Sequence, residues 1–106
     1  MRLRRGPFDD LVERQLDVFE EDEAGLLTEA RQADAAWTSA AAGDSEELYG
    51  DYQLVVDAIA ESLHEIRETY AATLAGQTTA EYRAAFDRAA RRRFRRYSTL
   101  LDESED

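Results

Sequence analysis

The chain has 106 residues, no cysteine and a formal net charge of −11 at pH 7. The lack of cysteine excludes a disulfide framework, a thiolate metal site and a cysteine nucleophile. No apolar run approaches the roughly 18 residues of a membrane span. We therefore expect a cytoplasmic protein of one domain, large enough to bury a core without covalent crosslinks.

The first predicted element is a long helix over residues 8–42, preceded at residues 1–6 by a basic arm that we expect to be mobile. The apolar residues of this helix lie within about 40° of one direction on a straight helix. They are Phe8, Val12, Phe19, Leu26, Ala30, Ala33, Trp37 and Ala41. Gly25 and the acidic residues 20–23 fall inside this pattern, so a kink or a break near Gly25 stays open.

A second helix is predicted over residues 45–75. Its large apolar residues recur at steps of three and four, which places them on one stripe of an α-helix. They are Leu48, Tyr52, Val55, Ile59, Leu63, Ile66, Tyr70 and Leu74. Asp44 and Glu47 have the spacing of a capping box, and Gly76 suits the left-handed residue just beyond a helix end.

A third helix is predicted over residues 79–101, with Thr78 and Glu81 as its capping box. Its inward side consists of Tyr82, Phe86, Ala89, Ala90, Phe94, Tyr97, Leu100 and Leu101. Residues 102–106 contain four acidic residues and no apolar one. We expect this segment to be a disordered acidic tail.

Short turns at Gly43 and Gly76 favour antiparallel neighbours. The sequence therefore predicts an all-α fold, an up-down-up antiparallel three-helix bundle with a long first helix. The amino-terminal third of that helix would extend beyond the other two and expose Phe8, Leu11, Val12 and Leu16. Because a second copy would cover such a patch, we expect a homodimer.

Charged residues also fall on the inward side of two predicted helices. Glu23 lies there between Phe19 and Leu26, and Arg93 has a similar place in the third helix. Counted from the two turns, Glu23, Arg67 and Arg93 lie at about the same height. We predict a buried charged layer in which Glu23 pairs with Arg93 or Arg67, a pairing that fixes helix register more than it adds stability. In the alternative, Glu23 marks a kink and lies in water.

Charge is unevenly distributed, with a net −15 over residues 8–80 and +5 over residues 81–101. The surface arginines of the third predicted helix are Arg88, Arg91, Arg92, Arg95 and Arg96. These arginines would neutralise the acidic helices of the same molecule, bind an acidic protein partner, or contact nucleic-acid phosphates. We favour the first interpretation and do not expect nucleic acid as a partner, because a net charge of −11 repels phosphate at long range.

Glu61 and His64 form a Glu-x-x-His pair, a spacing that di-iron helix bundles use for metal ligands. Asp57 and Glu68 lie on the same helix face, but that face points away from the apolar stripe. The four residues are candidate metal ligands if two copies bring these faces together. A solvated acidic face is the interpretation we prefer, and we predict no bound metal or other cofactor.

The sequence offers little for catalysis. It has one histidine and no cysteine, and it lacks a Ser-His-Asp pattern or a phosphate-binding glycine loop. We therefore predict a non-enzymatic helical bundle that acts by protein association, with the apolar overhang and the arginine-rich helix as contact surfaces. The alternatives are metal or small-ligand binding between copies, centred on His64, and nucleic-acid binding through the third helix.

Overall fold

The computed structural model describes residues 6–97, and this part of the chain is all-α with no β-strand. It contains α1 (Asp9–Asp22), α2 (Ala24–Thr38), α3 (Ser45–Ala71), α4 (Gln77–Arg93) and a short 3₁₀ helix, η1 (Arg95–Tyr97). The predicted helical class is confirmed. Four α-helices replace the predicted three, because the first predicted helix is divided. α2, α3 and α4 end at Thr38, Ala71 and Arg93, before the predicted ends at residues 42, 75 and 101. The arm at residues 1–5, residues 98–101 and the acidic tail lie outside the described residues.

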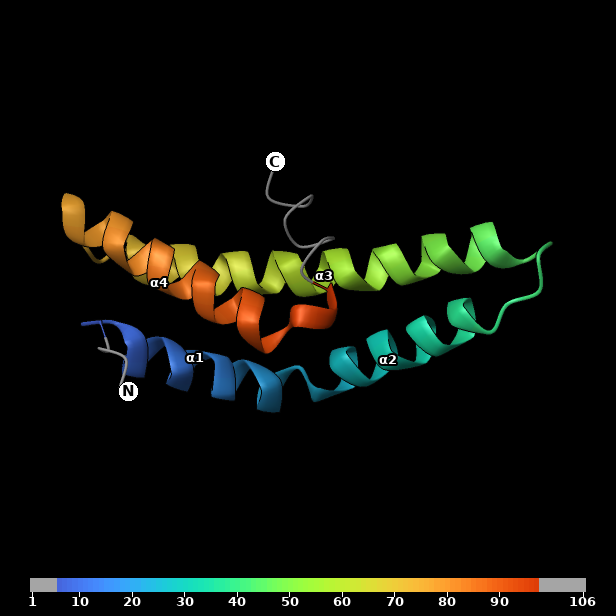
Figure 1. The fold of residues 1–106 in the computed structure, drawn as a ribbon. Coiled ribbons are helices and arrows are strands. Elements are labelled where there is room, and N and C mark those ends of the chain that lie inside the picture. Colours follow the sequence, from blue (N-terminus) through green and yellow to red (C-terminus); the bar gives the residue numbers. More distant parts are fainter. Residues whose placement is uncertain (1–5, 98–106) are drawn as a thin grey trace, which may run out of the picture.

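The first predicted helix is interrupted at a single residue, Glu23, with φ −111° and ψ 30°. The hydrogen-bond ladder continues on both sides, since Glu23 N–H donates to the Phe19 carbonyl at 2.8 Å and Leu27 N–H donates to the Glu23 carbonyl at 3.0 Å. α1 and α2 therefore follow one another with a bend between them (Figure 1). α1 has no basic residue in its last turn, and acids at the negative end of a helix dipole weaken that turn.

The predicted capping boxes do not form. Asp44 is the N-cap of α3, but its backbone has helical angles and its side chain makes no capping bond, whereas a capping side chain requires an extended backbone. α4 begins at Gln77, so Thr78 lies inside its first turn and Gly76 is the N-cap. Gly76 has φ +62°, the one positive φ in the described range, as a residue at this sharp turn requires.

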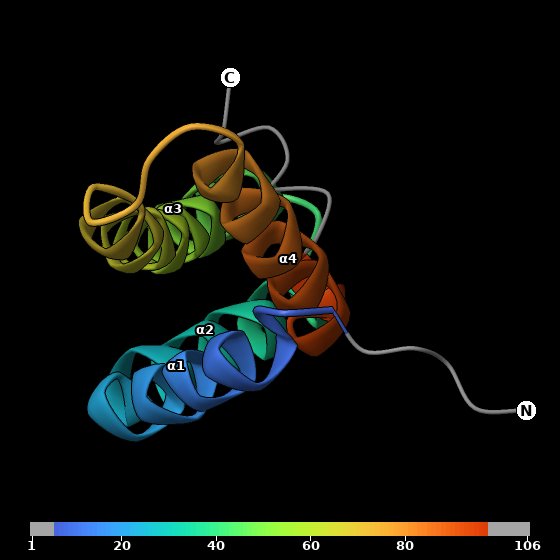
Figure 2. The same cartoon turned by 90° about the vertical axis from the view of Figure 1, so that its left-hand side faces the viewer.

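α3 runs antiparallel to α1 and α2, and α4 returns along the half of the hairpin that α1 forms (Figure 1). α2 packs directly against α3, whereas α1 packs chiefly against α4. Viewed end on, α4 spans the space between α1 and α3 along one side (Figure 2). None of the described helices is long and apolar enough to cross a membrane.

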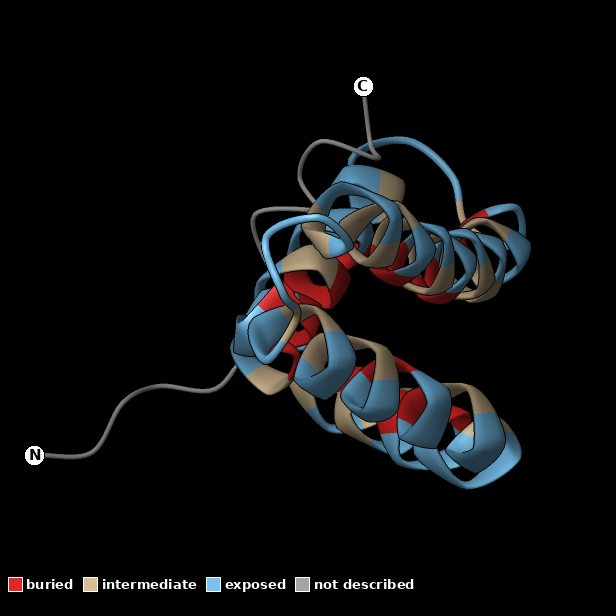
Figure 3. Ribbon diagram, turned by 90° about the vertical axis from the view of Figure 1, so that its right-hand side faces the viewer, coloured by how far each residue is buried: buried red, intermediate tan, exposed pale blue. Residues whose placement is uncertain are grey.

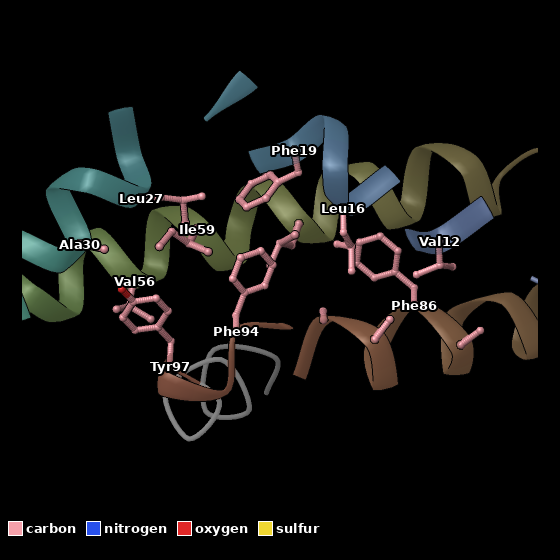
Figure 4. Close-up of a cluster of buried hydrophobic side chains, with 14 of the residues drawn as sticks. Val12, Leu16, Phe19, Leu27, Ala30, Val56, Ile59, Phe86, Phe94 and Tyr97 are labelled. Atoms are coloured by element: carbon pink, nitrogen blue, oxygen red, sulfur yellow. The ribbon is translucent and has the colours of Figure 1, made fainter. Parts of the chain in front are cut away.

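Buried residues from all four α-helices and η1 form a continuous core (Figure 3). Phe86 of α4 lies beside Val12 and Leu16 of α1, and Phe94 lies against Phe19 (Figure 4), with the two ring centroids 5.5 Å apart in an edge-on arrangement. The predicted overhang is therefore corrected. Val12 and Leu16 are both 0% exposed, because α4 covers α1 instead of leaving its first turns free.

Replacement of Leu16 by Ala tests whether α4 covers α1. Loss of this fully buried side chain is expected to lower the free energy of unfolding by about 2–5 kcal/mol, because the neighbouring side chains only partly fill the cavity that it leaves. Leu54→Ala is the matched control, since Leu54 is 69% exposed and its loss should change stability by less than about 0.5 kcal/mol. Urea unfolding followed by circular dichroism measures both. Equal effects of the two substitutions would contradict the packing of α4 on α1.

Candidate functional site

A groove with a volume of about 720 Å³ lies between α1 and α3, on the side that α4 leaves open. Its apolar surface comes from Leu11 and Val18 of α1 and from Ile66 and Tyr70 of α3. In Figure 2, α4 lies along one side of α1 and α3, and the groove lies on the other side. Val18 is 48% exposed, and only Leu54 among the other large apolar side chains of residues 6–97 is also classed as exposed.

The groove exists because α1 and α3 each carry a wider apolar arc than the core uses. At about 100° per residue, Leu11 and Val18 lie beside the face that Val12 and Leu16 present to α4. Ile66 of α3 flanks the core face of that helix in the same way. The bundle of the described residues therefore closes over one part of each arc and leaves the adjoining part in the groove.

Tyr82 of α4 is 0% exposed and contacts one lining residue of each wall of the groove. Its hydroxyl donates a 2.8 Å hydrogen bond to Gln15 Oε1 of α1, and its ring centroid is 4.8 Å from that of Tyr70 of α3. Burial raises the pKa of the Tyr82 hydroxyl, so the group stays a neutral donor. One side chain thus contacts both walls and sets their separation.

The sequence-predicted apolar contact residues divide between core and groove. Phe8 packs edge-on against Tyr82 with ring centroids 5.6 Å apart, and Val12 and Leu16 are inside the core. Leu11 lines the groove. Sequence reasoning missed Val18, Ile66 and Tyr70 as surface residues, although the position of Val18 beside Leu11 on the helix was a usable signal.

The rim of the groove is mainly acidic. Asp22 and Glu23 lie on the α1 side and Glu65 on the α3 side, and Arg14 is the one basic residue that lines the groove in the described part of the chain. Glu23, predicted to be inside a charged layer, is half-buried at the bend and lines the groove. Like charges gathered around an apolar surface create a negative field there.

Arg93 is the centre of the ion-pair cluster on α1, but its partners differ from the predicted one. It donates to Asp17 Oδ1 at 2.7 Å, to Glu20 Oε2 at 2.9 Å and to Glu13 Oε1 at 2.5 Å. These three acids repeat along one flank of α1, so a single guanidinium spans two helix turns. Within residues 6–97 Glu23 pairs with neither Arg93 nor Arg67.

Arg67 of α3 belongs to a second network on the outer side of α3 and α4. It donates to Asp87 Oδ1 at 2.8 Å and to Glu68 Oε2 at 2.9 Å. Arg83 of α4 donates to both oxygens of Glu68, at 2.7 and 3.0 Å. The hydrogen bonds from Arg83, followed by those from Arg67, lower the pKa of Glu68 to about 2. This network joins α3 to α4 where Asp87 and Arg83 face α3.

The four candidate metal ligands do not converge. Asp57, Glu61 and His64 are exposed on the outer face of α3, and Glu68 is engaged by two arginines. His64 Nδ1 accepts a 2.9 Å hydrogen bond from Arg67 Nη2, which places a cation beside that nitrogen. No group of three or more His, Asp or Glu residues in the described ranges could hold a metal ion.

The remaining arginines of α4 and η1 are largely exposed, and several face acids of the same chain. Arg92 lies 3.7 Å from Glu13, and Arg96 lies 3.6 Å from Asp34. Arg88, Arg91 and Arg95 are exposed, and Arg91 also makes an interaction within the protein. Neutralisation of the acidic helices, the first of the three interpretations, therefore accounts for Arg92, Arg93 and Arg96.

Comparison of the chain with protein-family models, with curated proteins and with solved structures gave no match. The site must therefore be interpreted from its own geometry and charge.

Glu68→Gln tests the ion-pair network of α3 and α4, because the effect of this substitution on stability should depend on pH. The pKa of Glu68 lies at about 2 in the folded protein, below its ordinary 4.5, so the carboxylate stabilises the fold above pH 4.5 and loses this effect as pH falls toward 2. Allowing for solvent screening of a partly exposed pair, we expect Gln to cost about 1 kcal/mol at pH 6 and much less at pH 2.5. Urea midpoints at both pH values measure the difference.

Glu61→Gln is the control for this experiment, because Glu61 is an exposed carboxylate on the same helix. Its effect on the urea midpoint should be small at both pH values. A Glu68→Gln cost that is the same at pH 6 and pH 2.5 would show that the two arginines do not hold the carboxylate in its ionised form.

Proposed function

We propose that the protein acts by protein–protein association, with the groove between α1 and α3 as its contact surface. The observation that carries this proposal is the apolar surface formed by Leu11, Val18, Ile66 and Tyr70, of which the described part of the chain leaves Val18 exposed and the other three half-buried. Apolar grooves with polar rims are surfaces on which other proteins dock.

The shape of the groove supports a helix as the docking element. On the helices its lining runs from Leu11 to Asp22 of α1 and from Ser62 to Tyr70 of α3, or about 12–17 Å along the walls at 1.5 Å per residue. α1, α4 and α3 follow one another around the molecule (Figure 2). The groove lies on the remaining side, between α3 and α1. A helix laid there would complete a four-helix arrangement of the kind in which antiparallel helices bury their apolar stripes.

A second copy of the chain is one candidate occupant of this groove. The predicted overhang no longer supports a homodimer, because Val12 and Leu16 are buried within the chain. Val18, which is 48% exposed, would be the apolar contact between two copies. We further propose a cytoplasmic location, on the ground that the chain contains no cysteine.

The proposed role is binding and not catalysis. The groove is lined by Ser62 and Thr69 among its polar residues, but no histidine or lysine stands beside them to activate a hydroxyl. Its volume of about 720 Å³ also falls within the range of small-molecule sites, so a small apolar ligand is the second candidate. The acidic rim gives no support to nucleic acid.

A neutral amphipathic peptide tests the proposal. The probe is a helical peptide of about 14 residues, with leucine at helical spacing on one face and glutamine on the other. We expect its binding to shift the backbone amide NMR signals of α1 and α3 around the groove. Val18→Asp should lower the affinity for the peptide at least tenfold, or by about 1.4 kcal/mol, because the new carboxylate would lose its bound water when the peptide covers it.

Leu54→Asp is the matched control, since Leu54 is a comparably exposed apolar residue of α3 that does not line the groove. Its affinity for the peptide should equal that of the unmodified protein. Equal losses at positions 18 and 54, or amide shifts confined to α2, would contradict the groove as the contact surface.

A further inference from the structure

We infer that the groove receives an amphipathic helix of another protein whose polar residues are basic, and not a second copy of this chain. This inference rests on the proposed function and names the chemistry of its partner. It is carried by the distribution of charge around the groove and by the contacts that already occupy the basic helix of this chain.

The acidic residues are concentrated toward one end of the groove. Asp22 is the last residue of α1 and Glu23 is its C-cap. Glu65 lies near the start of the part of α3 that lines the groove. Because α3 runs antiparallel to α1 (Figure 1), Glu65 lies toward the Asp22 end, whereas Thr73 lies toward the Leu11 end. The negative end of the α1 dipole points to the same region. A docking helix would therefore carry lysine or arginine over this end of its apolar stripe.

A second copy would bring further negative charge to this acidic surface. A two-fold contact of groove on groove joins two chains that each carry a net −11. If the two grooves are parallel, it also places Asp22, Glu23 and Glu65 of each copy near those of the other. Like charges brought together at an interface oppose binding and reduce the rate of encounter. The net negative charge of each chain therefore disfavours a second copy, which the apolar surface alone would accept.

The basic helix of a second copy does not supply the missing charge either. The apolar face of α4, with Tyr82 and Phe86, is buried in the core of its own chain. Arg93 is held by Glu13, Asp17 and Glu20. Insertion of α4 into another groove would break these contacts, which makes exchange between copies unfavourable. A basic helix of another protein could bind in the groove without the loss of these contacts.

The test compares three versions of the peptide of about 14 residues that share one leucine face and differ in their polar face, which contains arginine, glutamine or glutamate. Fluorescence anisotropy measures each affinity at about 50 and about 300 mM NaCl. We expect the arginine version to bind at least tenfold more tightly than the glutamate version at low salt. The difference should narrow at high salt, because screening weakens attraction at an exposed rim.

Two triple variants locate the source of this preference. Asp22→Asn, Glu23→Gln and Glu65→Gln together should reduce the preference for the arginine peptide over the glutamate peptide to less than about threefold. The matched control removes the same charge away from the groove, by Glu29→Gln, Glu46→Gln and Glu61→Gln, all exposed residues. That control should retain most of the preference for the arginine peptide over the glutamate peptide.

The inference is overturned if the glutamate peptide binds as tightly as the arginine peptide, or if both triple variants lower the preference equally. It is also overturned if light scattering of the protein alone at tens of micromolar gives two chains and Val18→Asp restores one. In each of these cases the proposed association itself survives. Failure of all three peptides, including the glutamine version, to bind would instead contradict the proposed function.

Discussion

The packing of α4 between α1 and α3 determines the other features of this molecule. α1 presents Val12 and Leu16 to α4, and therefore does not close against α3 as α2 does. Tyr82 of α4 contacts both walls, through its hydrogen bond to Gln15 and its ring contact with Tyr70. The core of the α1 half is thus built from three helices, and the apolar surface left between α1 and α3 is the groove.

The acidic residues at and near the end of α1 form two groups, according to whether an arginine of the same chain pairs with them. Asp17 and Glu20 face α4, where Arg93 neutralises them together with Glu13. Asp22 and Glu23 lie at the bend and face the groove, where no arginine of the described chain is within pairing distance of them. The first group fixes α4 to α1, and the second gives the groove its negative rim. The arginine-rich helix is therefore explained mainly by the protein's own charge, and the acidic remainder points to a basic partner.

Periodicity was sufficient to predict the helical class and the stripe of α3, because residues such as Ile59 and Leu63 repeat at the spacing of one face. It left a kink or break near Gly25 open, with a kink at Glu23 as an alternative, and could not decide between these and a continuous helix, because the hydrogen-bond ladder is nearly continuous at Glu23 and the register is preserved. Nor could it predict which part of a wide apolar arc the core uses. Val12 and Val18 are equally apolar in sequence, and only the tertiary position of α4 buries one and exposes the other.

The most direct test of this account is the reactivity of single cysteines introduced into a chain that has none. A bulky thiol reagent is applied to Ile66→Cys, with exposed Ala58→Cys and buried Leu63→Cys as references on the same helix. If the groove is open in the free protein, Ile66→Cys reacts within about tenfold of the rate of Ala58→Cys, and Leu63→Cys reacts far more slowly because it requires local unfolding. If Ile66→Cys is as slow as Leu63→Cys, the groove is closed or already covered, and the central claim is wrong.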